Sequence, residues 1–257
     1  QDADSVYQKV KDSVVFHLQE KQVSKASVQD YIEELFCIPF KLFGQPLYHF
    51  ELLQVEKSHF FLIVKLHHLI ADGWSMQLIA DSINSFYLNH GDEGKIFDYL
   101  DFNIECGTYS GSKRFTLDDI FWENKLKEIK VVSRPSEHNS IRAKRKSYYF
   151  EADLSDAIYR YIKEKNMPVN QFFVSVWGIL LNYMNGENKQ YIGMPIYNRR
   201  NTASKRTVGM YTNIVPLVLE VDVDQTIEQY MYKIKNSIYN SMKHSMYPFS
   251  NILDKVK

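Results

Sequence analysis

A short apolar run that ends in two adjacent histidines constrains the fold of this chain more than any other feature. Residues 60–64 read Phe-Phe-Leu-Ile-Val and lead into His67-His68, and Asp72-Gly73 begins four residues after the second histidine. From Trp74 onward, apolar residues return every three or four positions, which is typical of an amphipathic helix. The pattern predicts a buried strand, then a tight loop, then the start of a helix. A titratable side chain at such a junction would have the fixed geometry that acid–base chemistry requires.

Composition excludes several classes of protein. The 257 residues are 45% hydrophobic and 24% charged, which is ordinary for a globular chain. Lys plus Arg and Asp plus Glu number 31 each, so no bulk charge favours nucleic acid or an anionic membrane surface as a partner. The longest apolar runs are far too short to cross a bilayer, and the first residues lack a basic-apolar-small pattern, so we expect no secretory signal. Cys37 and Cys106 are the two cysteines, which suits a cytoplasmic protein without a disulfide scaffold.

The two ends of the sequence indicate a piece of a longer polypeptide. Gln1 is not an initiator methionine, and residues 249–257 stop within a helical apolar pattern. We therefore expect the 257-residue piece to be inactive by itself.

Strand-like and helix-like segments alternate along the chain, so the predicted fold class is α/β or α+β. In the first half we expect a helix after Ser27, a hairpin with arms at 47–55 and 60–66, a helix from Trp74, and a helix-like piece at 117–129. Residues 107–145 are otherwise weakly patterned, and we place a boundary between two lobes near residue 140. Beyond it we expect strands at 148–150, 191–196 and 214–221, and helices at 155–165, 172–184 and 226–242.

The histidine pair by itself favours no metal site. Neighbouring side chains of a strand point to opposite faces, so if strand geometry continues to the histidines, His68 shares a face with Leu66, and His67 with Lys65. Two imidazoles on opposite faces cannot easily bind one metal ion, and no further His or Cys lies at the spacing of a metal site. For an isolated pair, the simpler interpretation is two buried, hydrogen-bonded core histidines.

The pair does not stand alone, because four further segments accompany it in a fixed order. They are Ile38-Pro39-Phe40-Lys41-Leu42-Phe43-Gly44-Gln45-Pro46-Leu47, Tyr99-Leu100-Asp101-Phe102, Gly193-Met194-Pro195-Ile196-Tyr197-Asn198-Arg199 with Val208-Gly209-Met210-Tyr211-Thr212-Asn213, and His244-Ser245-Met246-Tyr247-Pro248-Phe249. These segments resemble the motifs PFDLxxGPL, YxDF, GxPxxNR with VGxFxN, and HQDYPFE of condensation domains from nonribosomal peptide synthetases, and His67 to Gly73 resembles their HHxxxDG motif. Lys41 departs from the family pattern, which has Asp there. Condensation domains belong to the chloramphenicol-acetyltransferase-like superfamily.

The resemblance covers nearly the whole chain and implies both a fold and a reaction. The implied fold is two similar lobes that meet in a V, here partial, with residues 1–140 as the remainder of the N-terminal lobe plus linker and 141–257 as the first part of the C-terminal lobe. The implied reaction is amide formation, in which the amine of an acceptor aminoacyl thioester attacks a donor acyl thioester. Both substrates would be carried on the phosphopantetheine of peptidyl carrier proteins, next to an adenylation domain, in the biosynthesis of antibiotics or other secondary metabolites. The domain itself would bind no cofactor, metal, nucleic acid or membrane.

The resemblance also assigns roles to single residues. His68 would be the catalytic histidine, either as a general base or by orienting the amine, and His67 would support it. Asp72 would hold the shape of the loop by pairing with an arginine, for which Arg199 is the candidate. Gly73 would permit close backbone approach beside the substrate tunnel, and Asn213 would lie near the seam between the lobes.

Several other matched residues and segments fit a structural role at least as well as a chemical one. Fold scaffolding is the simpler interpretation of Tyr99, Asp101, Pro195 and His244. The basic stretch at 141–146 is better explained as a solvated loop between lobes than as a surface for an acidic carrier protein.

Other members of the superfamily are alternatives. A stand-alone acyltransferase that uses coenzyme A remains open. A degenerate domain that only recruits partners is disfavoured, because such domains usually lose the histidine that stands here at position 68. A cyclisation domain is disfavoured because it replaces the first two histidines, and an epimerisation domain usually lacks the Asp-Gly-Trp-Ser continuation.

Overall fold

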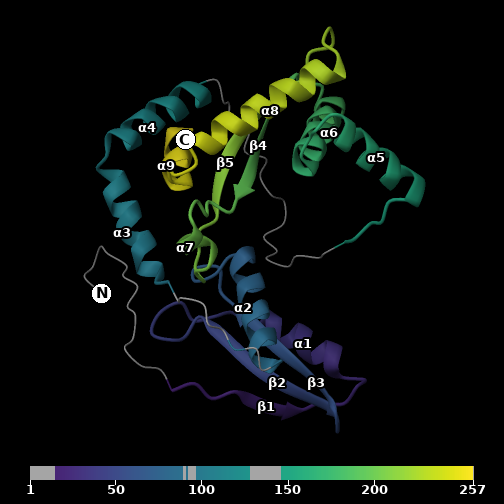
Figure 1. The fold of residues 1–257 in the computed structure, drawn as a ribbon, viewed down its shortest axis with the longest axis vertical. Coiled ribbons are helices and arrows are strands. Elements are labelled where there is room, and N and C mark those ends of the chain that lie inside the picture. The colour runs from purple at the N-terminus through teal and green to yellow at the C-terminus, as the bar shows by residue number, and fades with distance from the viewer. Residues whose placement is uncertain (1–14, 89–90, 92–96, 128–145, 257) are drawn as a thin grey trace. The chain divides into compact units, whose positions relative to one another are not determined.

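A computed structural model of the chain describes residues 15–88, 91, 97–127 and 146–256. The chain forms two compact units (Figure 1). Unit 1 comprises residues 1–90 together with 208–210, and unit 2 comprises residues 91–207 and 211–257. The predicted lobe boundary near residue 140, and the basic stretch apart from Lys146, lie outside the described residues, so the division at 140 stays a prediction.

Unit 1 is a three-stranded sheet with two helices. Its elements are β1 (Gln19–Gln22), α1 (Val28–Cys37), β2 (Tyr48–Glu56), β3 (His59–Leu66) and α2 (Gly73–Tyr87). The strand order is β1-β2-β3, with β1 parallel to β2 and β2 antiparallel to β3. In the hairpin, Tyr48 lies opposite Leu66 and Leu52 lies opposite Leu62. The predicted hairpin and the helix after it are thereby confirmed.

A small core joins α1 to the sheet of unit 1. Leu53 of β2 and Ile63 of β3 are buried with Val23, and four side chains of α1 pack against them: Val28, Tyr31, Ile32 and Leu35. At the end of α1, Lys65 Nζ donates hydrogen bonds to the carbonyl oxygens of Leu35, at 2.8 Å, and Ile38. The last carbonyls of a helix lack partners within the helix, so a cation at this point stabilises its C-terminus.

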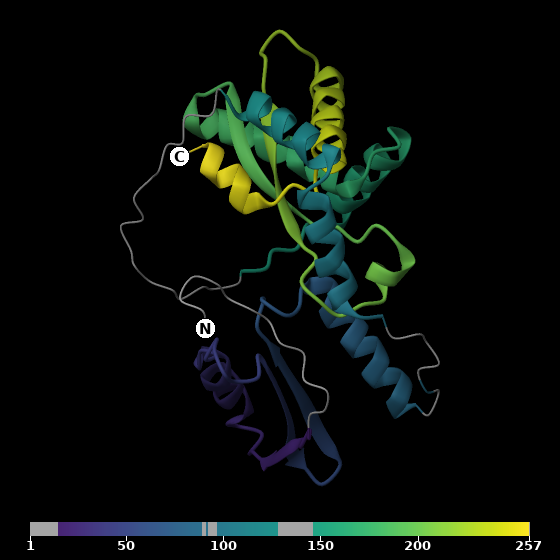
Figure 2. The same ribbon diagram turned by 90° about the vertical axis from the view of Figure 1, so that its left-hand side faces the viewer.

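Unit 2 contains two paired strands and seven of the described helices. Its elements are α3 (Tyr99–Ser110), α4 (Lys113–Leu126), α5 (Ala152–Glu164), α6 (Val169–Asn185), β4 (Lys189–Ile196), α7 (Thr202–Lys205), β5 (Asn213–Glu220), α8 (Ile227–Lys243) and α9 (Phe249–Lys255). β4 and β5 are antiparallel, with Lys189 opposite Glu220 and Ile196 opposite Asn213. Helix α8 lies along the strand pair, and α9 lies beside β5 in both views (Figures 1 and 2).

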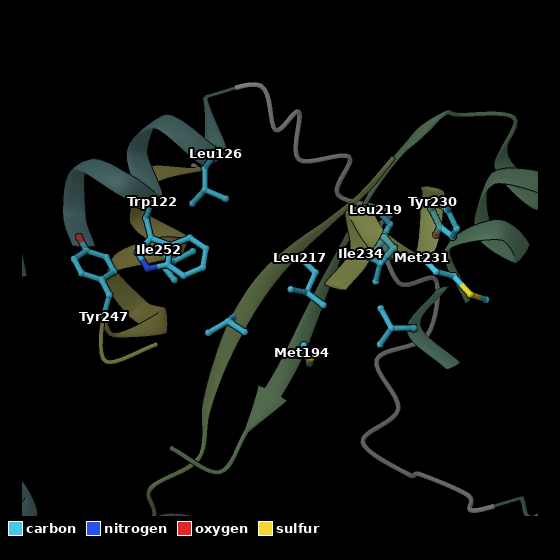
Figure 3. Close-up of a cluster of buried hydrophobic side chains, with 12 residues drawn as sticks. Trp122, Leu126, Met194, Leu217, Leu219, Tyr230, Met231, Ile234, Tyr247 and Ile252 are labelled. Atoms are coloured by element: carbon cyan, nitrogen blue, oxygen red, sulfur yellow. The ribbon is translucent and has the colours of Figure 1, made fainter. Parts of the chain in front are cut away.

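The core of unit 2 follows the alternation of β5. Val215, Leu217 and Leu219 are spaced by two, share one face of the strand, and are fully buried. Figure 3 shows further members of the cluster on either side of the strands: Trp122, Leu126, Tyr247 and Ile252 from α4 and the α9 region, and Tyr230, Met231 and Ile234 from α8. The strands predicted at 191–196 and 214–221 and the helices predicted at 172–184 and 226–242 are confirmed as β4, β5, α6 and α8.

Two expectations about unit 2 are wrong. Residues 148–150 form no strand, and the side chains of Tyr148 and Tyr149 are 83% and 94% exposed. An aromatic run has high strand propensity, but it becomes a strand only where a ladder partner exists, and none lies beside it among the described residues. The weakly patterned segment that follows residue 107 contains the end of α3 and all of α4, which begins at Lys113 and not near residue 117.

Gly178 in α6 gives a sharp test of core packing. A Cβ at this position would lie 2.1 Å from the Tyr230 hydroxyl oxygen and 3.2 Å from Leu219 Cδ1. Tyr230 is 2% exposed and donates a hydrogen bond to the Ser175 carbonyl at 3.2 Å, so its ring cannot move aside freely. We expect Gly178→Ala to lower the free energy of unfolding, measured with urea, by about 1–3 kcal/mol.

The control for that change is Gly107→Ala in α3, where a Cβ would meet no atom within 4 Å. There the same substitution should stabilise the helix by about 0.5–1 kcal/mol. Tyr230→Phe removes the clashing oxygen and should restore part of the stability that Gly178→Ala loses. Equal stability of the two glycine variants would contradict the packing argument.

Candidate active site

The predicted histidine loop begins where β3 ends. Leu66 is the last residue of the strand, and the backbone N–H of His67 extends the ladder by one bond to Leu47, at 2.9 Å. The chain then turns, because the N–H of Ile70 donates to the carbonyl of His67 at 3.0 Å. Strand geometry therefore does not continue to His68, so the condition under which the two imidazoles were expected on opposite faces of a strand is not met. A turn, and not the alternation of a strand, directs the His68 side chain.

The two imidazoles have opposite hydrogen-bonding roles. His68 Nδ1 lies 3.1 Å from the carbonyl oxygen of Ala71, and because a carbonyl only accepts, Nδ1 carries the proton. The basic lone pair of neutral His68 is therefore on Nε2. His67 Nδ1 accepts from the backbone N–H of Leu69 at 3.0 Å, so its own proton is on Nε2. Fixing one ring nitrogen in this way is how proteins select the tautomer of a working histidine.

Neither histidine is a buried core residue. His68 is exposed, and His67 is partly buried with its ring packed edge-to-face against Phe40 at 5.9 Å between ring centres. Phe40 lies three residues beyond the end of α1, and its ring centre is 4.9 Å from Lys65 Nζ. The Lys65 side chain thus contacts both the end of α1 and the Phe40 ring against which His67 packs. His68 makes its bond to Ala71 through Nδ1, and none of the described residues hydrogen-bonds its Nε2.

Asp72 anchors the start of α2. Its side chain is 1% exposed, and its Oδ1 accepts hydrogen bonds from both the backbone N–H and the Oγ of Ser75, each at 2.8 Å. A carboxylate at the N-cap satisfies helix N–H groups and interacts favourably with the helix dipole. These contacts support the structural role predicted for Asp72. Its predicted partner Arg199 belongs to unit 2, and that pairing stays a prediction.

Gly73 is the first residue of α2, and no atom of the described chain requires glycine there. A Cβ would meet nothing within 4 Å among the described residues. Close approach of a substrate to this backbone stays a prediction.

Ser75 is a site residue that the sequence analysis did not identify. It is fully buried, and its Oγ accepts from the N–H of Gly209 at 3.0 Å and lies 2.8 Å from the Gly209 carbonyl oxygen. Residues 208–210 belong to unit 1, although the residues on both sides belong to unit 2. The sequence signal for this role was a Ser at the third helical position after an N-cap Asp. Side chains at that position often hydrogen-bond back to the N-cap residue.

Unit 2 fixes the other two predicted site residues. Arg199 is 8% exposed, donates from one guanidinium nitrogen to the carbonyls of Ser204 and Thr207, and lies 4.2 Å from the ring centre of Tyr211. Its placement is that of a preorganised cation.

Asn213 Nδ2 donates to the carbonyls of Ser245 and Tyr247, at 2.8 and 2.9 Å, and so ties the start of β5 to the turn before α9. Its position near a seam stays a prediction.

Two properties of the described part of the chain concern other classes of site. Within it, no three His, Cys, Asp or Glu side chains are grouped so that they could hold a metal ion. None of its helices has the length and apolarity needed to span a bilayer.

The geometry can be compared with known proteins. A family model described as the condensation domain matches residues 1–257. The chain belongs to the condensation domain family. Similar proteins include gramicidin S synthase 2 of Aneurinibacillus migulanus, 23% identical over 256 residues that cover 97% of this chain and 6% of the relative. Bacitracin synthase 3 of Bacillus licheniformis is 22% identical over 255 residues, which cover 97% of this chain and 4% of that protein. The chain thus spans only a small fraction of the length of these relatives.

Solved structures show the same fold. The first condensation domain of the calcium-dependent antibiotic synthetase, in complex with a substrate analogue, matches with a TM-score of 0.79 at 14% identity over 93% of this chain and 56% of that one. The condensation domain from the monacolin K polyketide synthase MokA matches with a TM-score of 0.79 at 18% identity, over 93% of this chain and 58% of that one. The predicted family and the chloramphenicol-acetyltransferase-like fold class are confirmed.

The anchoring role of Asp72 can be measured against a second N-cap aspartate. We expect Asp72→Ala to lower the free energy of unfolding by about 1–3 kcal/mol, because it leaves the buried N–H of Ser75 without its acceptor. Asp98 is the matched control, since its Oδ1 caps exposed α3 by accepting from the Leu100 N–H at 2.9 Å. Asp98→Ala should cost about 0.5–1 kcal/mol. If Asp72→Ala is as stable as the unchanged chain but inactive, Asp72 has a chemical role instead.

Proposed function

We propose that this condensation domain forms an amide bond between a donor acyl or peptidyl thioester and the amine of an acceptor aminoacyl thioester, with His68 as the catalytic residue. The observation that carries the proposal is the bond from His68 Nδ1 to the Ala71 carbonyl, which leaves Nε2 as the free basic nitrogen of an exposed side chain. Membership of the condensation family supplies the reaction class.

The chemistry matches what such an imidazole can do. The acceptor amine attacks the thioester carbonyl, the new C–N bond forms, the C–S bond breaks, and the departing thiolate takes up a proton. A thioester is already activated, so most of the catalytic task is positioning. The amine must lose a proton during this sequence, and Nε2 of neutral His68 can accept that proton or hold the amine by accepting its hydrogen bond.

The partners in the proposal are carrier proteins. Donor and acceptor peptidyl carrier proteins would deliver the two thioesters on phosphopantetheine, and an adenylation domain in the same polypeptide would load the acceptor. The relatives that this chain matches are named as synthases of gramicidin S and bacitracin, and the chain covers 6% and 4% of their lengths, which supports a place within a multidomain synthetase.

The test is amide formation by the full-length polypeptide. Donor and acceptor carrier domains are loaded with aminoacyl or acyl groups, mixed with the enzyme, and the condensed product is detected by mass spectrometry. Product that requires both loaded carriers supports the proposal. Product formed equally well when the donor is a free coenzyme A thioester would instead indicate a coenzyme A-dependent acyltransferase, and no product with any donor would refute amide formation.

A further inference from the structure

We propose that Ser75 is a positioning residue for His68, a role that rests on the proposed function of His68. Ser75 would not touch the substrate. It would act by locking the backbone that holds the His68 imidazole in the tautomer with a free Nε2.

The first argument is the number of bonds that converge on one buried hydroxyl. Ser75 Oγ lies 2.8 Å from Asp72 Oδ1, 2.8 Å from the Gly209 carbonyl oxygen and 3.0 Å from the Gly209 nitrogen. A hydroxyl has one proton and two acceptor sites, so it accepts from Gly209 N–H and donates to one of the two oxygens at a time. Its side chain is fully buried, so no water replaces these bonds when the oxygen is removed.

The second argument is the short path from Ser75 to the imidazole. Asp72 follows Ala71 directly, and the Ala71 carbonyl is the group that holds His68 Nδ1 at 3.1 Å. Asp72 Oδ1 is bonded to the backbone and the side chain of Ser75, which fixes the peptide unit between Ala71 and Asp72 from one side. Loss of the Ser75 hydroxyl removes one of these two bonds and so holds this peptide unit less firmly. The carbonyl can then turn away from Nδ1, and the proton can move to Nε2.

The third argument is the anchor on the other side of Ser75. Residues 208–210 are part of unit 1, and 134 positions separate Gly209 from Ser75 in the sequence. Two hydrogen bonds between such distant segments are tertiary contacts and do not follow from the local geometry of the helix. It holds the start of α2 against a second segment of chain, which gives the His68 loop a support that the helix alone lacks.

The experiment reads the tautomer directly. In the 257-residue chain labelled with ¹⁵N-histidine, two-bond ¹H–¹⁵N correlation spectra at a pH where His68 is neutral report which ring nitrogen carries the proton, and His68→Gln identifies the signals. We expect His68 to be mainly the Nδ1–H tautomer. In Ser75→Ala, the ratio of Nδ1–H to Nε2–H should fall about threefold to tenfold, the factor that corresponds to loss of one hydrogen bond. In the full-length enzyme, kcat should fall by a similar factor while KM changes less than about twofold.

Ser175→Ala is the matched control. Ser175 is also fully buried, but its Oγ donates at 2.8 Å to the Gln171 carbonyl within α6 of unit 2. This variant loses a buried hydroxyl and should leave the His68 signals unchanged. Ser75→Cys keeps a weaker hydrogen-bonding group and should shift the ratio less than Ser75→Ala, which keeps the proposal testable if the alanine variant does not fold.

A folded Ser75→Ala chain with the tautomer ratio of the unchanged chain would overturn the proposal. The same holds if Ser175→Ala shifts the ratio as much as Ser75→Ala does. The spectra are recorded without substrate, so failure of the enzyme to form amides would refute the proposed function and leave the tautomer result to be judged separately.

Discussion

Replacing His68 with alanine is expected to lower kcat/KM for amide formation in the full-length enzyme by about 10²- to 10⁴-fold. The change removes the free Nε2, which is the basic nitrogen that the Ala71 carbonyl selects by holding Nδ1. The His68 side chain is exposed, so its removal leaves no cavity in a core. The melting temperature should therefore change little. The measurement is product formation by mass spectrometry at several concentrations of loaded acceptor carrier.

Two other histidines of unit 1 provide the controls. His67→Ala removes the contact with Phe40 and the acceptor for the Leu69 N–H, and we expect a smaller loss of about tenfold or less through disturbance of the loop. His59 is exposed at the far end of the same hairpin, where its ring lies against Phe61 at 5.0 Å, so His59→Ala should leave turnover unchanged. Near-normal turnover by folded His68→Ala would remove His68 from the mechanism.

The parts of the fold that the sequence predicted are those with a strong local period. The hairpin of β2 and β3 and the helices α2 and α6 form where the hydrophobic pattern predicted them, and α8 also buries Tyr230, Met231 and Ile234 on one side. β1 has the sequence Gln-Glu-Lys-Gln with all four side chains exposed, and it is a strand because of its parallel ladder to β2. That ladder joins residues about thirty positions apart, so no local pattern predicts it.

Helix α3 was not predicted for a related reason. Only Tyr109 of its twelve residues is buried among the described residues, so its sequence has no apolar stripe for a periodicity argument to detect. A local signal was present in Asp98, which caps the helix by accepting from the Leu100 N–H. Capping signals of this kind mark a helix start even where burial does not.

The candidate site divides in the same way between local and distant interactions. His68 and Asp72 lie within one short motif, and their local contacts agree with a base beside a helix N-cap. The bond between Ser75 and Gly209 joins residues far apart in the sequence, and the turn at His68 replaces the strand that simple alternation assumed. The turn depends on where the strand ends, and the bond depends on which distant segments come together. Hydrophobic periodicity predicts neither of these.

The largest expected loss of stability lies in unit 2, at Asp118. This carboxylate is 1% exposed and accepts from Arg114 Nε at 2.9 Å, from His244 Nδ1 at 2.6 Å and from the Tyr109 hydroxyl at 2.7 Å. Burial and the bond to Asp118 raise the pKa of Tyr109 well above its usual value, so the phenol stays a donor. The three donors come from α3, α4 and His244, which follows the last residue of α8, and His244 also stacks on Phe121 with ring centres 3.7 Å apart. These contacts support the scaffolding role predicted for His244.

Asp118→Ala should therefore lower the free energy of unfolding by about 3–5 kcal/mol, because it leaves three donors, one of them a cation, around an empty acceptor position. Asp118→Asn keeps one carbonyl oxygen and should lose less. The neighbouring residue is the control: Asp119 pairs with Lys255 at 2.8 Å and accepts from the Tyr247 hydroxyl, but its side chain is 34% exposed. Asp119→Ala should cost about 1 kcal/mol, since water replaces much of what it loses. Urea unfolding measures both variants. If Asp118→Ala loses no more stability than Asp119→Ala, the buried network does not hold these helices together and the packing of Trp122 and Tyr247 must do so instead.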